Sequence, residues 1–566
     1  MKQIKPKADI LIEVSYEIVA KLGGIHTVIK TKAPFMKKYY KNNYWVIGLY
    51  NKRDAKTKFK RQEPNKELKS LFAKLRKNNI ICHYGIWDTK SNPQAILIDI
   101  SRLIKDKQTK NKIMEDYWVH FLLHDNYHNN SLLFGYSAGK LISELVKLRS
   151  FKNKKVVVNA HEYMSGLSLL YLRKHKCNLP LVFTTHSTSL GRALAFKGHD
   201  IYKDSLIYKK KNKRSYYQKL QSYSKLVGTT LYQRHLFEKA CAKKADVLTT
   251  VSEITSKESA FLLDCPADIV TPNGLDTITP PSIEEQFAIN YKSRQKIIKF
   301  LQDYFRPYYQ IKTENSLLFY TAGRYEIYTK GYDLFFEALK RLNIRLKKEK
   351  YPHTIFVLLF IMVSHKKVKK DLINTLNLSK KNSKLKRKGY PPNSMFEAKN
   401  NLIPSYLKKN SLLNKSNDKV KVLFYPAPAR KKDKLLSMHY KEIVSSMDLG
   451  IFPSLYEPWG YTPLETAAMS TIAITTDVAG FGKFIDKRTD QRKTPGIIVL
   501  KTREKEKEPI IGNLAKIMHK VVHMSKEKRI QKRVEANKLA GLANWEDFSK
   551  EYIKAHNLAI KKHRKK

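Results

Sequence analysis

The stretch LGIFPSLYEPWGYTPLETAAM, residues 449–469, joins an apolar run to the start of a helix. Its first part, LGIFPS, is typical of a buried strand, and Pro-Trp-Gly marks the turn that follows. Thr462, Pro463 and Glu465 occupy positions suited to an N-cap, a first and a third helical residue. We therefore predict a strand, a turn and a helix that begins with a Thr-x-x-Glu capping box.

The same stretch also has a chemical interpretation. The N-terminal end of a helix presents N–H groups and a positive dipole end, which suit an anion such as a phosphate. Glu457 lies at the edge of that helix end. From these residues alone the capping interpretation is favoured, because capping boxes are far commoner than active sites.

Apolar runs of strand length alternate with segments of helical period along the whole chain. The runs are ADILIEVS, YWVIGLY, KKVVVNAH, LPLVFTTH, ADVLTTVS, SLLFYTAG, TIFVLLFIMV, VKVLFYP and LGIFPS. Strands separated by helices are typical of parallel, doubly wound α/β sheets. The runs form two series, which a Pro-Asn-Gly turn in IVTPNGLD, residues 269–276, separates.

We therefore predict two Rossmann-like, doubly wound domains that face a cleft, with ligands at the carboxyl ends of the strands. The first domain is expected at residues 1–274 and the second at 275–544. A final helix, residues 545–566, is expected to cross back to the first domain. The Lys-, Asn- and Ser-rich segment of about 365–418 is expected to be a helical insertion on the second domain.

Composition excludes several classes of protein. With 566 residues the chain is too long for one core, and 42% hydrophobic residues suffice for packed domains. The four cysteines show neither a disulfide framework nor zinc-ligand spacing, so no metal is expected. They are Cys82, Cys177, Cys241 and Cys265. No signal peptide is apparent, and TIFVLLFIMV is about half of a membrane span, so we expect a cytoplasmic protein.

The net charge of +59 would ordinarily favour a nucleic-acid or anionic-polymer partner. Lys is spread over nearly every segment, however, and runs such as KKKNKRS have no interleaved aromatic residues. Such runs are more typical of a solvated surface. Specific nucleic-acid binding is therefore not expected.

Several polar residues follow the predicted strands. In the first domain, Gly23 and Gly24 precede a helix, so backbone N–H groups could meet a diphosphate there. His161 follows KKVVVNA, and His186 follows LPLVFTT. Each of these features alone is more often a turn or a structural hydrogen bond, but the carboxyl ends of parallel strands are where ligand contacts collect.

In the second domain, Arg324 and Lys330 lie just beyond the strand SLLFYTAG. Two fixed cations at a strand end suit a diphosphate leaving group, because the charge that develops on it needs a counter-charge. For either cation alone, a surface ion pair is the simpler interpretation.

Seven ordered blocks together resemble the glycogen synthases of the eukaryotic type, which have the two-domain GT-B glycosyltransferase fold. The blocks are EVSYEIVAKLGGIHTVIKTKA, HEYMSGLSLLYLR, FTTHSTSLGRAL, TTVSEIT, DIVTPNGLD, FYTAGRYEIYTKGYDLFFEALKRLN and FPSLYEPWGYTPLETAAM. The resemblance implies retaining transfer of glucose from UDP-glucose to the non-reducing end of an α-1,4-glucan such as glycogen, with no metal and no cofactor.

The resemblance also implies roles for individual residues. Arg324 and Lys330 would hold the diphosphate, Glu457 would act near the reacting sugar, and His161 would contact that sugar. Glu465 would lie toward the ribose. The other residues expected to bind the donor nucleotide sugar are Lys21, Gly23, Gly24, His186, Asn273, Tyr461 and Thr462.

Two alternatives stay open. An ADP-glucose-dependent glucan synthase also has a Lys-x-Gly-Gly loop, here KLGG, but that family resembles Glu-Pro-Cys-Gly-Leu where this chain has EPWGY. The other alternative is a basic polymer- or nucleic-acid-binding protein on an inactive glycosyltransferase scaffold. The presence of Glu457, Glu465, Arg324 and Lys330 argues against it.

The resemblance raises the question of regulation and assembly. Family members respond to glucose 6-phosphate through an arginine-rich helix and to phosphorylation of both tails. Here Arg529, Arg533 and Lys538 form a possible phosphate site, while Glu527 and Glu535 replace arginines. We expect almost no tail to phosphorylate, weak activation by glucose 6-phosphate, and a homo-oligomer smaller or weaker than the family tetramer.

Overall fold

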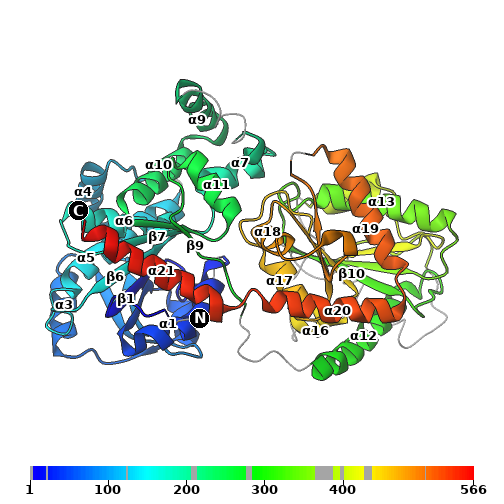
Figure 1. Ribbon diagram of the computed structural model, residues 1–566, viewed down its shortest axis with the longest axis horizontal. Coiled ribbons are helices and arrows are strands. Elements are labelled where there is room, and N and C mark those ends of the chain that lie inside the picture. The colour runs from blue at the N-terminus through cyan, green and yellow to red at the C-terminus, as the bar shows by residue number, and fades with distance from the viewer. Residues whose placement is uncertain are drawn as a thin grey trace. The chain divides into compact units, whose positions relative to one another are not determined.

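The computed structural model describes residues 4–20, 23–122, 125–204, 213–275, 283–363, 387–394, 401–425, 436–503 and 505–565. The chain forms two compact units (Figure 1). Unit 1 comprises Met1–Asp276 and Ala543–Lys566, and unit 2 comprises Thr277–Leu542. Each unit has its own sheet with helices packed on it, which is the predicted doubly wound α/β architecture.

Unit 1 contains a nine-stranded sheet in the order β3-β4-β5-β2-β1-β6-β7-β8-β9. The strands are β1 Ile10–Val14, β2 Tyr44–Leu49, β3 Phe59–Arg61, β4 Ile81–Trp87, β5 Gln94–Asp99, β6 Val156–His161, β7 Leu181–Thr185, β8 Val247–Thr250 and β9 Ile269–Val270. Pairing is parallel from β5 to β9, whereas β3 and β4 form an antiparallel edge. The carboxyl ends of β1, β6, β7 and β8 therefore meet at one edge.

The helices of unit 1 cover this sheet. They are α1 Ile25–Tyr40, α2 Lys52–Lys58, α3 Lys66–Arg76, α4 Lys107–Tyr117, α5 Asn126–Leu145, α6 Glu162–Lys174, α7 Ser189–Phe196, α9 Lys213–Val227, α10 Thr229–Lys244, α11 Glu253–Leu262 and α21 Trp545–His563. Helix α21 is the C-terminal red helix of Figure 1, and the indole of Trp545 donates to Thr31 of α1 at 2.9 Å. A Cβ on Gly274 would come within 2.7 Å of that indole, so glycine is required there.

Unit 2 contains a six-stranded parallel sheet in the order β12-β11-β10-β13-β14-β15. The strands are β10 Leu317–Arg324, β11 Ile355–Met362, β12 Val420–Phe424, β13 Leu449–Ile451, β14 Ile472–Thr476 and β15 Ile497–Leu500. The helices are α12 Ile283–Phe305, α13 Tyr332–Lys348, α15 Ile403–Lys409, α16 Tyr440–Ser446, α17 Tyr461–Ala468, α18 Gly480–Asp486, α19 Lys507–Val522 and α20 Lys526–Gly541.

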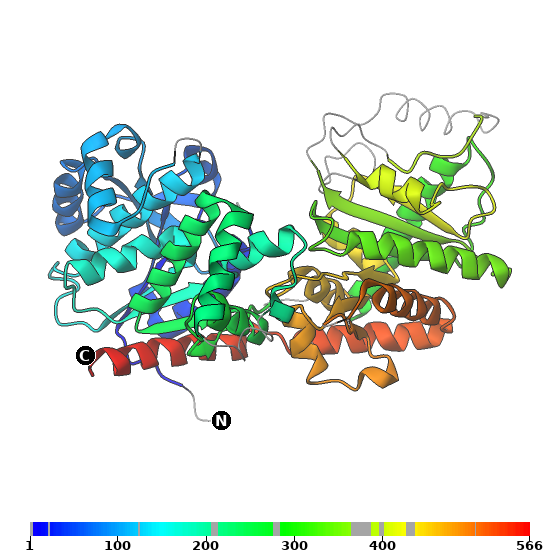
Figure 2. The same ribbon diagram turned by 90° about the horizontal axis from the view of Figure 1, so that it is seen from above.

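Alternate residues of the central strands enter two different cores. Leu317 and Phe319 of β10 pack with α13 and α19, whereas Leu318 and Tyr320 pack with α12 and α16. A strand buried on both faces reads as a continuous apolar run, which is why these strands were recognisable in the sequence. Figure 2 shows α13 lying along the sheet.

All nine apolar runs form strands. The expected final helix, residues 545–566, corresponds to α21 of unit 1, and α20 of unit 2 ends before it, with a break at residues 542–544. About half of the expected insertion at 365–418 lies outside the described residues, and its described part contains α15.

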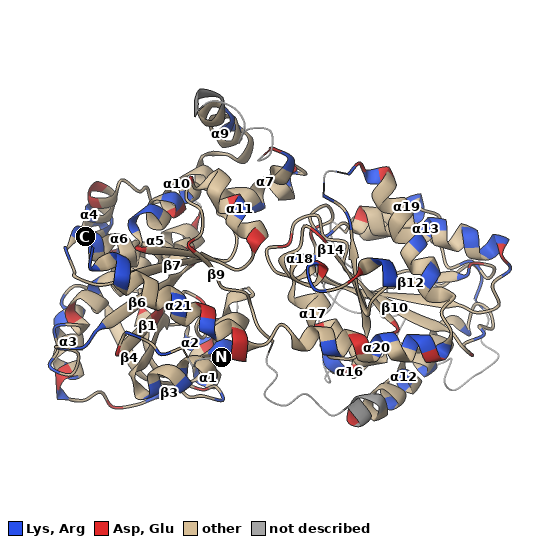
Figure 3. Cartoon of the chain, in the orientation of Figure 1, with Lys and Arg blue, Asp and Glu red and all other residues tan. Residues whose placement is uncertain are grey.

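Positive charge is not gathered on one element. Figure 3 shows Lys and Arg on helices of both units. Among the described residues, none of the helices has the length and apolar character that crossing a membrane requires.

Candidate active site

The loop from β10 to α13 brings a cation against the loop that follows β13. Gly331 has φ 64°, and a Cβ there would lie 2.1 Å from the carbonyl oxygen of Pro453. The backbone N–H of Leu455 donates to the Thr329 carbonyl at 2.9 Å, and that of Tyr456 donates to the same oxygen at 3.2 Å. Glycine at position 331 thus allows the two loops to be bonded edge to edge.

Lys330 and Glu457 form an ion pair at this junction. The ammonium of Lys330 donates to the carboxylate of Glu457, and the side chains are only 14% and 21% exposed. The carbonyl of Glu457 also accepts the N–H of Gly480, at 3.0 Å, which further fixes the backbone of the loop that carries Glu457. The carboxylate therefore occupies a defined position at the carboxyl edge of the sheet, as the sequence predicted for both residues.

Arg324 ends β10 at the same edge. Its Nε pairs with Glu326 at 3.1 Å, and its side chain is 50% exposed. Glu326 in turn accepts the hydroxyl of Thr329 at 2.9 Å. A half-exposed guanidinium at the end of a strand suits recognition of an anion such as a phosphate.

The predicted capping box at Thr462 is wrong. Helix α17 begins at Tyr461, its N-cap is Gly460 at φ 110°, and no side chain caps it. The turn requires a left-handed residue before the helix, and only glycine adopts that conformation without strain, so the cap lies two residues earlier than predicted. Tyr461, Thr462 and Glu465 instead fall at helical spacings of three and four, which places them on one face of the first turns.

In unit 1 the predicted histidines belong to a buried network. His161, the last residue of β6, places Nε2 2.6 Å from Glu13 Oε1 and Nδ1 3.0 Å from His186 Nε2. Glu13, the penultimate residue of β1, also accepts from Lys32 and, at 2.5 Å, from the Tyr44 hydroxyl. The side chains of Glu13, Lys32 and His161 are fully buried.

The charges of this network follow from its burial. Burial alone would raise the pKa of Glu13, but the charge of Lys32 and the hydrogen bond from His161 hold it well below its usual range. Burial lowers the pKa of His161 and lowers that of His186 further. A neutral His161 must then donate from Nε2 to the Glu13 carboxylate and accept at Nδ1 from His186.

A second buried group surrounds the loop after His186. Glu162 has φ 63°, uncommon for a residue other than glycine, and its carboxylate accepts the N–H of His186 at 2.7 Å. Glu238 accepts the N–H of Ser189 at 2.8 Å. Burial, followed by the charge of Glu238, raises the pKa of Glu162 to about 8, and burial raises the pKa of Glu238 to about 7.

Sequence reasoning missed Glu13, Lys32 and Glu238. A charged residue within an apolar strand was the available signal for Glu13, since such a group must find a partner. No local pattern pointed to Lys32 or Glu238, because their partners lie far away in the chain.

The other residues of unit 1 that were predicted to bind the donor nucleotide sugar are less closely grouped. The N–H of Gly23 donates to Glu17 at 2.7 Å, and Gly24 is the N-cap of α1. Asn273 is buried, and its Oδ1 has no hydrogen-bond partner within the described part of the chain. Lys21 lies outside the described residues.

The structure does not bring the predicted allosteric residues together. The Arg533 guanidinium is buried and donates to the carbonyls of Met447 and Ser445, at 3.0 and 2.7 Å. Arg529, one turn earlier, donates to the Met524 carbonyl at 2.5 Å. Lys538 is exposed and lies nine residues after Arg529, which is about half a rotation around the helix. Arg533 is therefore a structural residue in the interior of unit 2.

Known proteins resemble this chain over nearly its whole length. The family model described as glycogen synthase matches residues 13–381 and 369–565. Glycogen [starch] synthase isoform 1 of Saccharomyces cerevisiae is 29% identical over 625 aligned residues, covering 98% of this chain and 86% of the yeast protein. The liver glycogen [starch] synthase of Homo sapiens is also 29% identical, over 97% of this chain and 83% of its own.

Among solved structures, the catalytic domain of starch synthase IV from Arabidopsis thaliana, bound to ADP and acarbose, matches with a TM-score of 0.55. It covers 98% of this chain and 99% of its own at 14% identity, which shows a shared fold. The two doubly wound domains, the shared fold and the family match together show a glycosyltransferase of the GT-B class. The chain belongs to the glycogen synthase family.

Proposed function

We propose that this enzyme transfers glucose from UDP-glucose to the non-reducing end of an α-1,4-glucan, with retention of anomeric configuration. The observation that carries the proposal is the Lys330–Glu457 pair at the carboxyl edge of the unit 2 sheet, beside the half-exposed Arg324. Membership of the glycogen synthase family supports a nucleotide-sugar donor and a glucan acceptor.

The chemistry requires groups of both signs. As the nucleotide diphosphate leaves, negative charge develops on it, which Arg324 and Lys330 would neutralise. Positive charge develops on the reacting sugar, and the Glu457 carboxylate would stabilise it. In the structure Lys330 neutralises Glu457, so an arriving diphosphate would compete for the ammonium and leave the carboxylate free to act on the sugar.

The roles of the other predicted residues remain proposals. The His161 imidazole is fully buried and bonded at both nitrogens, so it would contact the donor sugar once His186 moves away from its Nδ1, with its orientation fixed by Glu13. The Gly23-Gly24 loop would lie beside the diphosphate, and Glu465 toward the ribose. His186, Asn273, Tyr461 and Thr462 would complete the donor contacts. No cofactor and no metal take part in the proposed transfer.

The choice of donor decides between the proposal and its main alternative. Purified full-length protein is incubated with glycogen and either UDP-glucose or ADP-glucose, and polymer growth is measured. We expect growth with UDP-glucose at a kcat/KM at least about tenfold higher than with ADP-glucose, a difference of about 1.4 kcal/mol. Preference for ADP-glucose would establish the alternative donor, and no growth with either would favour an inactive scaffold that binds polymers.

A further inference from the structure

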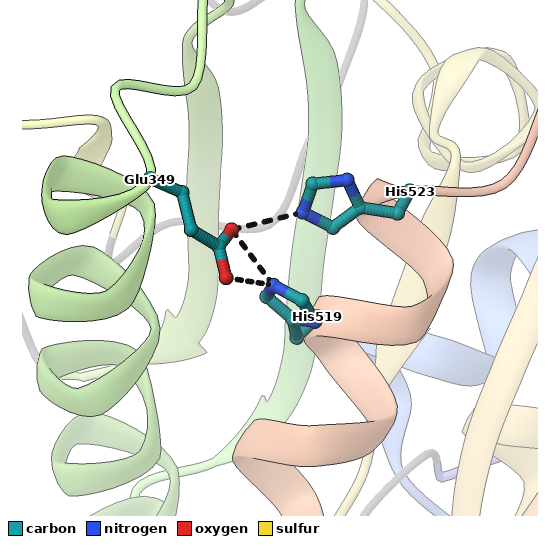
Figure 4. A group of neighbouring side chains, drawn as sticks. All are labelled: Glu349, His519 and His523. Atoms are coloured by element: carbon teal, nitrogen blue, oxygen red, sulfur yellow. Dashed lines mark hydrogen bonds and ion pairs between the residues drawn. The ribbon is translucent and has the colours of Figure 1, made fainter.

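Three possible metal ligands meet at the end of unit 2 that is remote from the proposed active site. Glu349 is the C-cap of α13, while His519 and His523 lie one turn apart at the end of α19. Figure 4 shows both imidazoles directed at the Glu349 carboxylate. His519 Nε2 lies 2.9 Å from both carboxylate oxygens, and His523 Nε2 lies 3.1 Å from one of them.

These separations are close to those that a metal ion imposes. Zn²⁺ binds imidazole nitrogen and carboxylate oxygen at about 2.0–2.2 Å in tetrahedral geometry, so two of its ligand atoms lie about 3.3 Å apart. The ligand atoms of all three residues lie within 4.8 Å of one another. Small movements of the three side chains would therefore admit an ion between them.

The surroundings hold the three side chains in place. Arg345 Nε donates to Glu349 Oε1 at 2.9 Å, as groups behind a metal ligand commonly do. The ring of Tyr351 packs edge-on against His523, with centroids 5.4 Å apart. Side-chain exposures of 32%, 15% and 43% for Glu349, His519 and His523 leave the site open to an ion.

We propose that Glu349, His519 and His523 bind one Zn²⁺ ion, with water completing its coordination. Two imidazoles and a carboxylate are a set that zinc accepts, whereas Ca²⁺ and Mg²⁺ prefer oxygen ligands. Without a metal, the Glu349 carboxylate would accept hydrogen bonds from the N–H groups of both histidines. Titration with zinc distinguishes this hydrogen-bonded group from a metal site. The cysteine pattern predicted no metal site, because it did not include this constellation.

The role of this site is structural. Helix α13 separates it from Lys330, and 17 residues at 1.5 Å each make about 25 Å. An ion would join the end of α13 to the end of α19, which pack on the same face of the sheet. Because the ligands come from distant parts of the chain, the unfolded state would bind zinc more weakly, and zinc would stabilise the folded state.

The test uses the full-length protein, stripped with a chelator that is then removed. Isothermal titration with Zn²⁺ is expected to show one high-affinity site per chain with a dissociation constant below about 10 µM. The melting temperature should rise by at least about 3 °C at a hundredfold excess of Zn²⁺ over that constant. His519→Gln and Glu349→Gln should each weaken binding at least tenfold, whereas the exposed His199→Gln in unit 1 should not.

Replacement by Co²⁺ provides a second readout, because its visible absorption is strong for four-coordinate and weak for six-coordinate sites. A strong band that His519→Gln removes and His199→Gln retains would support the proposal. Absence of binding at 100 µM Zn²⁺, or equal binding by His519→Gln and His199→Gln, would overturn it. Melting curves of the metal-free variants verify folding, and if one variant fails to fold, His523→Gln takes its place.

Discussion

Glu13 Oε1 lies 2.6 Å from His161 Nε2, and both side chains are fully buried. The same carboxylate neutralises Lys32, whose ammonium also lies 3.8 Å from the centroid of the Tyr552 ring in α21. The Glu13 carboxylate therefore orients the imidazole of His161 and neutralises the buried ammonium of Lys32. The orientation of His161 and the stability of unit 1 depend on the same residue.

Glu13→Gln should therefore lower both stability and activity. Removing one partner of a buried ion pair leaves an uncompensated charge, which costs about 3–5 kcal/mol. The double variant Glu13→Gln with Lys32→Met should recover most of the free energy of unfolding, measured by urea denaturation. It should remain at least tenfold below wild-type turnover, because the charged acceptor that orients His161 is still absent. Full recovery of turnover in the double variant would contradict a positioning role for Glu13.

The pair Glu162 and Glu238 should make stability fall with rising pH. Their pKa values are raised in the folded state, so their contribution is greatest below the unfolded pKa of about 4.5. It is lost as pH rises through about 7 to 8. Glu238→Gln removes one of these ionisations. In wild type the free energy of unfolding should fall between pH 5.5 and pH 8.5, and in the variant this fall should be smaller by about 1–2 kcal/mol.

The measurement is urea unfolding at both pH values. Glu63→Gln provides the control, because Glu63 lies in the same unit and its side chain is 87% exposed. If Glu238→Gln and Glu63→Gln show the same pH dependence as wild type, the two buried carboxyl groups do not titrate as described.

Glu457→Gln should abolish transfer and leave UDP-glucose binding largely intact. The substitution removes a charge that acts in the transition state and retains most ground-state contacts. A loss of at least about a hundredfold in kcat is expected. Lys330→Ala should weaken both donor binding and turnover. The control is Glu337→Gln, a partly exposed residue of α13 that pairs with Arg341. Turnover of Glu457→Gln above about a tenth of wild type would exclude this role.

Chelation should lower the stability that the proposed zinc site provides without slowing glucose transfer. Treatment with EDTA is expected to leave kcat at 25 °C within about twofold of the untreated enzyme, because the proposed transfer uses no metal. It should lower the melting temperature if the Glu349 site is filled as purified. Loss of turnover that Mg²⁺ or Mn²⁺ restores would show that a metal takes part in transfer.

Local sequence patterns were sufficient to predict the central strands of the two sheets but not every edge strand. β11 is buried on both faces and appears as the uninterrupted run TIFVLLFIMV. β4, with the sequence ICHYGIW, is mostly half-buried and pairs antiparallel at the edge, so no continuous apolar run marks it. The helix after Trp459 was predicted, whereas its first residue depended on the backbone conformation of Gly460, which the capping pattern does not encode.

The candidate site divides in the same way. Arg324 ends β10, and Lys330 and Glu457 lie in the loops that follow β10 and β13, so the fold rule alone placed them at one edge. Pairings such as Lys32 with Glu13, or Glu349 with His519, join residues whose separation in the chain carries no periodic signal. They follow from tertiary packing and could not be predicted from one sequence.

Glucose 6-phosphate should stimulate the enzyme less than about fivefold, the low end of ordinary allosteric coupling. A phosphate effector requires several exposed guanidinium groups that converge. Arg533 is instead buried and donates to two backbone carbonyls, and burial lowers its pKa to about 10. Lys538 lies on another face of α20, and Glu535 pairs with Lys532 at 2.8 Å.

An effector shifts an equilibrium only by its differential affinity for the two states, so a site without converging cations can transmit little coupling. The measurement is the initial rate at sub-saturating UDP-glucose, with and without millimolar glucose 6-phosphate. Glucose 1-phosphate at equal concentration provides the control for a general anion effect. Activation well above fivefold by glucose 6-phosphate alone would mean that α20 rearranges to expose Arg533, since the described packing leaves that guanidinium no access to a soluble phosphate.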